Sequence, residues 1–146
     1  MNYAGNSVAA IAVSAHEIGH VLQHAEGYAP MQVRSAIVPV VNVASMAAFP
    51  VFLIGMFFHS GMSVFLMDLG ILLFSATLLF HLVTLPVEFN ASKRALVQLT
   101  EMGTVAPEEV RGAKQVLDAA ALTYVAAAAM SALQILRLLL IRNSRD

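Results

Sequence analysis

Two histidines and a glutamate lie close together near the start of the chain, in the segment AHEIGH. His16 and His20 are four residues apart, so on a helix both imidazoles project from one face and can bind the same cation. Glu17 lies between them. In a zinc site of this HExxH type, the glutamate takes a proton from zinc-bound water, whose pKa the metal lowers towards about 7. The motif therefore predicts Zn²⁺ at His16 and His20, with Glu17 as the general base.

A catalytic zinc ion needs a third protein ligand and one open position. The chain has no cysteine, so this ligand must be His, Asp or Glu. A metzincin would carry a glycine and a third histidine downstream of His20, but Gln23 and Glu26 occupy those two positions. His24 is one turn beyond His20, yet one straight helix cannot easily wrap three consecutive turns around a tetrahedral ion. We expect His24 to face lipid headgroups, or to contact one of the metal-binding side chains without binding the metal itself.

Glu88 is the better candidate because two predicted membrane spans separate it from the HExxH helix. Two crossings return the chain to the membrane face where it began, which brings the two helices to the same side. Ala91 and Ala95 follow on one helix face and permit close packing against a helix that carries Gly19. The alternatives are an ordinary first-turn glutamate favoured by the helix dipole, and a glycine that is merely tolerated. The sequence thus predicts Glu88 as the third ligand.

Two further polar residues could line this site. His81 is seven residues before Glu88, on about the same helix face, and could stabilise an oxyanion or only bond a neighbouring helix. The hydroxyl of Tyr124 could donate to a tetrahedral intermediate, or the ring could belong to an interfacial belt of aromatic residues. Asp68 is expected to face headgroups, and we assign it no chemistry.

The elements that must position these groups are strongly apolar. Of the 146 residues, 59% are hydrophobic and 12% are charged, whereas soluble domains carry about 25% charged residues. Long apolar stretches predict membrane-spanning helices over about 35–58, 62–85 and 119–141. A net charge of -1 provides no basic field to hold nucleic acid. The sequence predicts an all-α integral membrane protein that forms a single domain over 1–146, with the lipid bilayer as a partner.

Two further helices should carry the site. The HExxH helix is expected over 7–26, because Gly27 is a good helix stop, and its apolar part is too short to cross a bilayer. After the second span, Pro86 is well placed in a first turn, which predicts a separate third-ligand helix over 86–103. Pro107 begins a further helix that runs into the third span.

The sequence resembles the family of membrane zinc metallopeptidases often called YugP-like, through SVAAIAVSAHEIGHVLQHAEGYAP, LVTLPVEFNASKRAL and GAKQVLDAAALTYVAAA. This resemblance covers nearly the whole chain and implies His16, Glu17, His20 and Glu88 in the roles given above. The chain also resembles gluzincins more widely, in which the ligand glutamate opens an ExxAD-type helix. Here the motif reads EFNAS, so Ser92 replaces the aspartate that orients a ligand histidine. We expect Ser92 to support the ligand histidine, or an oxyanion, more weakly than an aspartate would. Alternatively, another residue supports the histidine.

Members of this family carry an additional N-terminal portion with its own apolar segment, whereas this chain begins almost at the HExxH helix. We expect that the chain lacks this portion. If the portion normally supplies the strand that binds substrate, the isolated chain would bind zinc yet cleave poorly.

Taken together, these features predict a membrane-bound zinc endopeptidase that acts on peptide or membrane-protein substrates in a bacterial cell membrane. More basic residues lie on the predicted site side of the spans than on the other, which places the site in the cytoplasm by the positive-inside rule. Those on the site side are Arg34, Lys93, Arg94, Arg111 and Lys114. One rival is an intramembrane protease of the site-2 type, although no LDG segment occurs. Another is a noncatalytic scaffold or partner-binding protein, whose properties would not depend on Glu17.

Overall fold

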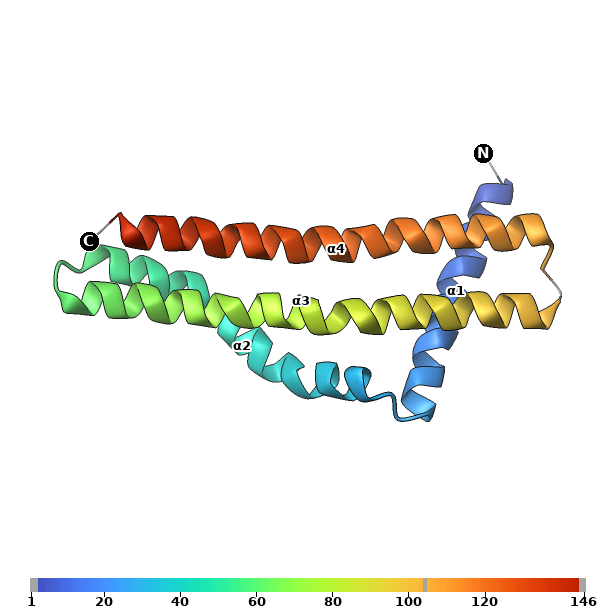
Figure 1. Ribbon diagram of the computed structural model, residues 1–146, viewed down its shortest axis with the longest axis horizontal. Helices are drawn as coiled ribbons and strands as arrows, with labels where there is room; N and C mark the ends of the chain where they lie inside the picture. The colour runs from blue at the N-terminus through green and yellow to red at the C-terminus, as the bar shows by residue number, and fades with distance from the viewer. Residues whose placement is uncertain (1–2, 104, 145–146) are drawn as a thin grey trace. The chain divides into compact units, whose positions relative to one another are not determined.

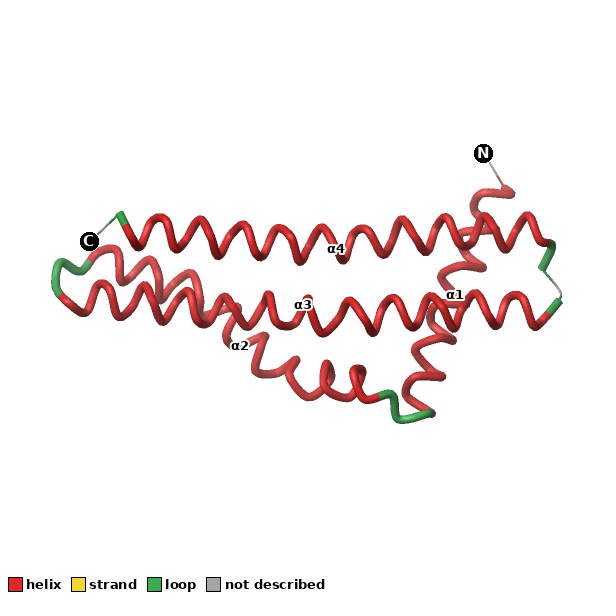
Figure 2. The backbone as a smooth tube through the Cα atoms, viewed as in Figure 1, coloured by secondary structure: helices red, strands yellow, loops and turns green. Residues whose placement is uncertain are grey.

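The computed structural model describes residues 3–103 and 105–144, and all its regular elements there are helices (Figures 1 and 2). The helices are α1 (Tyr3–Ala25), α2 (Ala29–Phe57), α3 (Gly61–Met102) and α4 (Pro107–Asn143). Helices α2, α3 and α4 are long and apolar enough to cross a membrane. The predicted all-α class with three such helices is confirmed.

Helix α1 begins at Tyr3, earlier than the predicted residue 7, and ends at Ala25. Gly27 follows with a φ of 67°, in the left-handed region that favours glycine. The Gly27 N–H donates to the carbonyl of His24 at 3.2 Å, and the Tyr28 N–H donates to that of Gln23 at 2.9 Å. This pair of hydrogen bonds is a Schellman motif, which ends the helix where the glycine predicted an end.

The predicted break at Pro86 is absent, because the stretches expected over 62–85 and 86–103 form the single helix α3 with Pro86 inside it. The φ angle of proline fits a helix, although the ring removes one hydrogen bond to the carbonyl four residues earlier. Membrane helices tolerate this loss because neighbouring groups compensate for it. Glu88 therefore lies in a helix interior, and the alternative of a first-turn glutamate does not apply.

The chain divides into two compact units, each with its own core. The first unit comprises residues 1–33 and 84–125, and the second comprises 34–83 and 126–146. Helices α3 and α4 contribute residues to both. That all of these residues form a single domain stays a prediction.

In the first unit, α1 packs on the C-terminal part of α3 and the N-terminal part of α4 through small side chains. A Cβ atom added to Gly19 would lie 2.3 Å from the carbonyl oxygen of Ala91, and one added to Gly112 would lie 2.9 Å from Val8. The buried cluster consists of Ala12, Ala15, Ala95, Leu99, Ala113 and Leu117. The close approach expected at Gly19 and Ala91 is confirmed, so the glycine is needed for packing.

The second unit has larger core side chains and an apolar outer surface. Its buried cluster consists of Phe52, Met67, Ile71 and Leu138. On α2, Val43 is 70% exposed and Met46 is 79% exposed, which suits contact with lipid better than contact with water. Asp68, expected to face headgroups, forms an ion pair with Arg142 of α4 at 2.8 Å.

Candidate metal centre

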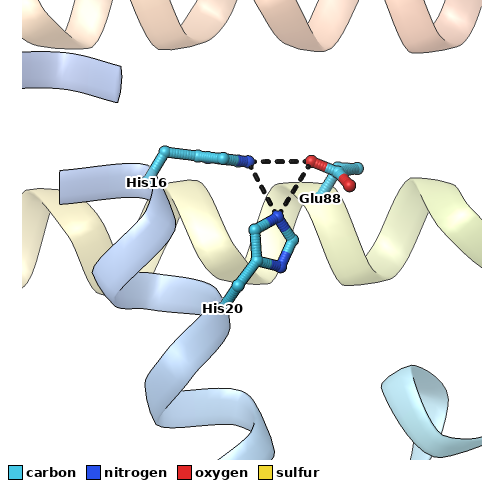
Figure 3. A group of neighbouring side chains, drawn as sticks. All are labelled: His16, His20 and Glu88. Atoms are coloured by element: carbon cyan, nitrogen blue, oxygen red, sulfur yellow. Dashed lines mark hydrogen bonds and ion pairs between the residues drawn. The ribbon is translucent and has the colours of Figure 1, made fainter. Parts of the chain in front are cut away.

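Three side chains from two helices converge in the first unit. His16 and His20 project from α1, and Glu88 projects towards them from α3 (Figure 3). Glu88 Oε2 lies 2.8 Å from His16 Nε2 and 3.5 Å from His20 Nε2. The two Nε2 atoms are 3.1 Å apart. The residues that the sequence predicted as metal ligands thus point one atom each at a common centre.

The spacing of these three atoms fits a small cation. Ligand atoms about 2.0–2.1 Å from a tetrahedral zinc ion lie about 3.3 Å from one another, close to the 3.1 and 3.5 Å found here. The third separation, 2.8 Å, is that of a hydrogen bond. The Glu88 side chain is 4% exposed, whereas those of His16 and His20 are 16% and 18% exposed. One side of the centre therefore remains accessible, as a catalytic metal site requires.

The close helix crossing explains how a carboxylate reaches both imidazoles. Gly19 lies between the two histidines on α1, and its missing side chain lets the α3 backbone approach at Ala91. Ala91 and Ala95 are fully buried at this crossing, and Glu88 is 3% exposed. Because Glu88 is one turn before Ala91, its side chain is held in the same contact.

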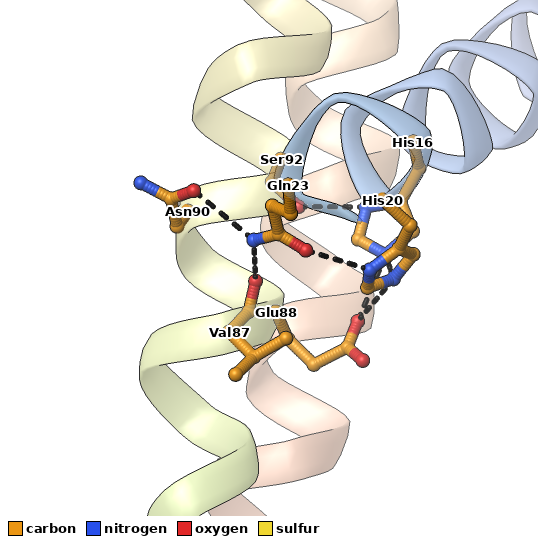
Figure 4. A network of polar contacts seen from close by, with 7 residues as sticks. All are labelled: His16, His20, Gln23, Val87, Glu88, Asn90 and Ser92. Atoms are coloured by element: carbon orange, nitrogen blue, oxygen red, sulfur yellow. Dashed lines mark hydrogen bonds and ion pairs between the residues drawn. The ribbon is translucent and has the colours of Figure 1, made fainter. Parts of the chain in front are cut away.

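Ser92 contacts the outer nitrogen of one histidine. Its Oγ lies 3.1 Å from His16 Nδ1, while Nε2 of the same ring faces Glu88 (Figure 4). Ser92 thus makes, with a neutral hydroxyl, the contact for which the gluzincin pattern uses an aspartate. A hydroxyl is a weaker acceptor than a carboxylate, so it polarises the ring less.

Gln23 supports the other histidine, a contact that the sequence did not predict. Its Oε1 accepts a hydrogen bond from His20 Nδ1 at 2.9 Å. Its Nε2 donates to the Val87 carbonyl at 2.8 Å and to Asn90 Oδ1 at 3.0 Å (Figure 4). Gln23 is fully buried, so these hydrogen bonds replace all contact with water. The available signal was a polar residue three positions after His20, on the same helix face.

Arg94 extends these contacts towards the end of α1. Its Nε donates to Asn90 Oδ1 at 2.7 Å, and a terminal nitrogen donates to Glu26 Oε2 at 2.6 Å. The guanidinium carbon also lies 5.5 Å from the centre of the Tyr28 ring, within range of a cation–π contact. These contacts hold the residues that follow α1 against α3, next to the candidate metal centre.

The remaining predicted residues lie outside these contacts. Glu17 and His24 are exposed on α1, and Tyr124 is half-buried on α4. His81 belongs to the second unit, where its ring centre is 6.0 Å from that of Phe80. The base role of Glu17 and the supporting or oxyanion roles of the other three stay predictions.

Two histidines of an HExxH helix and a carboxylate from a second helix could hold a metal ion, in a chain with three helices long and apolar enough to cross a membrane. The sequence matches the family described as "Putative neutral zinc metallopeptidase" over residues 1–143. The chain belongs to this family.

A curated relative extends this result. The chain is 50% identical over 145 residues to the protein named "Putative membrane protease YugP" of Bacillus subtilis (strain 168). The alignment covers 99% of this chain and 63% of the relative, so the chain spans less than two thirds of the length of that protein. No solved structure shows a significant match.

Proposed function

We propose that the chain is the zinc-binding part of a membrane-bound endopeptidase, in which His16, His20 and Glu88 hold Zn²⁺ and Glu17 is the general base. The observation that carries this proposal is the convergence of three ligand atoms from α1 and α3, with separations of 2.8 to 3.5 Å. Two neutral imidazoles and one carboxylate are a donor set that suits zinc and leaves its fourth position open.

Zinc in this position would supply Lewis acidity, which polarises a peptide carbonyl and acidifies water. The chain supplies the proton transfers. Glu17 follows His16 on α1 and is exposed, so its carboxylate can take a proton from water and later deliver it to the leaving amine. Peptides or membrane proteins are the proposed substrates.

The proposed location is a bacterial cell membrane, with the centre on the cytoplasmic side. The membrane location is supported by three helices that are long and apolar enough to cross a bilayer. More basic residues lie on the proposed site side of the spans than on the other side, which supports a cytoplasmic centre through the positive-inside rule.

Metal analysis of the detergent-purified chain tests the ligand set. We expect about one zinc ion per chain in the wild type, and its loss in His20→Ala and in Glu88→Ala, because two ligands hold zinc too weakly. Glu101→Ala is a matched control, since Glu101 is an exposed carboxylate farther along α3. Full zinc content in Glu88→Ala would show that a residue other than Glu88 is the third ligand.

Glu17→Gln tests catalysis separately from metal binding. We expect this variant to keep its zinc and to cleave denatured casein about 10²–10⁴-fold more slowly, the usual contribution of a general base. Equal cleavage by wild type and variant would contradict the peptidase function and favour a noncatalytic scaffold.

A further inference from the structure

We propose that the Gln23 amide, oriented with the help of Asn90 and Arg94, determines which nitrogen of His20 carries its hydrogen and thereby keeps Nε2 free to bind metal. All three are positioning residues. The consequence for metal binding rests on the proposed function, because it treats His20 as a ligand. The direction of each hydrogen bond between these side chains follows from two groups, one of which can only donate and one of which can only accept.

The first unambiguous group is the guanidinium of Arg94, which can donate hydrogen bonds but cannot accept them. Its Nε lies 2.7 Å from the side-chain oxygen of Asn90, which fixes that end of the amide as the oxygen. The same oxygen lies 3.0 Å from the side-chain nitrogen of Gln23. Asn90 therefore presents an acceptor to Gln23.

The second unambiguous group is the backbone carbonyl of Val87, which can only accept. It lies 2.8 Å from the nitrogen of the Gln23 side chain. Two acceptors, the Val87 carbonyl and Asn90 Oδ1, thus surround one end of the Gln23 amide. That end must be the NH₂ group, because the opposite orientation would leave both hydrogen bonds unmade in a fully buried place.

The Gln23 oxygen then faces His20 Nδ1 at 2.9 Å and can only accept. A neutral His20 ring must therefore carry its hydrogen on Nδ1, which leaves a lone pair on Nε2. Nε2 is the atom that faces His16 Nε2 at 3.1 Å and Glu88 Oε2 at 3.5 Å. The Gln23 amide thus sets the position of the hydrogen on His20. Asn90 and the partly exposed Arg94 support the orientation of this amide.

His16 differs, because in the metal-free chain its Nε2 lies 2.8 Å from Glu88 Oε2, and an ionised carboxylate accepts the hydrogen of this nitrogen of His16. Its Nδ1 contacts the hydroxyl of Ser92 at 3.1 Å, and a hydroxyl can either donate or accept. Ser92 therefore tolerates hydrogen on either nitrogen of His16. The two histidines differ, since one is prepared in advance and the other adapts when a metal ion arrives.

Nitrogen-15 NMR of the metal-free chain in detergent tests this inference, since it distinguishes hydrogen on Nδ1 from hydrogen on Nε2. We expect wild-type His20 to carry it on Nδ1. Gln23→Met should give a mixture of the two forms. Arg94→Met should give a smaller fraction of the Nε2 form, because the Val87 carbonyl still orients the Gln23 amide, and Arg94→Lys should restore part of the wild-type signal because lysine also donates.

Two controls separate this effect from the loss of any ion pair. Glu26→Gln removes the charge that pairs with Arg94 but leaves its hydrogen bond to Asn90, and Lys114→Met removes the ion pair with Asp118. Neither variant should change the His20 signal. Arg94 has a 22% exposed side chain, so Arg94→Met tests the proposal even if Gln23→Met fails to fold.

Zinc affinity provides the second readout. Gln23→Met should weaken binding about 10–100-fold, as loss of a residue that orients a ligand usually does, and Lys114→Met should leave it unchanged. The inference is overturned if His20 keeps hydrogen on Nδ1 in both Gln23→Met and Arg94→Met. If wild type binds no zinc, the proposed function fails, whereas the NMR result on the metal-free chain still decides the present inference.

Discussion

Gly19 shows how much a single hydrogen atom matters at the crossing of α1 and α3. A methyl group there would lie 2.3 Å from the Ala91 carbonyl oxygen, which is part of a helix backbone and cannot rotate away. We expect Gly19→Ala to destabilise the protein by about 1–3 kcal/mol through overpacking, in spite of the better helix propensity of alanine. Zinc content should also fall, because the crossing aligns the ligands. Thermal unfolding and metal analysis measure both effects.

Gly61→Ala is the matched control for this prediction. Gly61 is also helical, but a Cβ atom added there meets no atom within 4 Å. Its substitution should leave stability unchanged or raise it slightly, with unchanged zinc content. Equal effects of the two substitutions would contradict the packing role of Gly19.

The site residues differ in how far the sequence could predict them. The four-residue spacing of His16 and His20 corresponds directly to one face of a helix, so these two required no tertiary information. Glu88 required an argument from membrane crossings, and the structure brings it to both imidazoles. Gln23 could not be predicted in this way, since its partners Val87 and Asn90 are 64 and 67 residues away.

At the scale of elements, Pro86 lies inside α3 without ending it. We expect Pro86→Ala to raise the free energy of unfolding by up to about 3 kcal/mol, because alanine restores the N–H that can donate to the carbonyl of Leu82. The exposed position of Pro86 means that the substitution leaves no cavity. Thermal unfolding followed by circular dichroism measures the change, with zinc content as the control. A loss of stability would show that α3 needs the proline.

The two helix ends that were predicted from glycine and proline illustrate what local sequence can specify. Gly27 adopts a φ of 67°, which few other residues tolerate, so its presence marks a real end. Pro86 needs only a helical φ, which is equally compatible with the start and the interior of a helix. Whether the helix continues depends on the packing of the residues on both sides, and the local sequence does not contain that information.

At the scale of the whole molecule, the absence of cysteine makes the membrane orientation directly measurable. Lys114→Cys and Ser144→Cys each place one exposed thiol near an end of α4. We expect a membrane-impermeant maleimide to label Ser144→Cys in intact cells, and Lys114→Cys only after the cells are opened. The wild type should remain unlabelled. The reverse pattern would contradict the proposed orientation, and labelling of both in intact cells would contradict a crossing by α4.

The separation of the ligands along the chain has a consequence for synthesis. Glu88 follows His16 by 72 residues, and all of α2 lies between them. A ribosome therefore releases both imidazoles well before the carboxylate exists. A half-made chain has only two of the three proposed metal ligands, so the proposed hydrolytic activity cannot begin before α3 has been translated and has met α1.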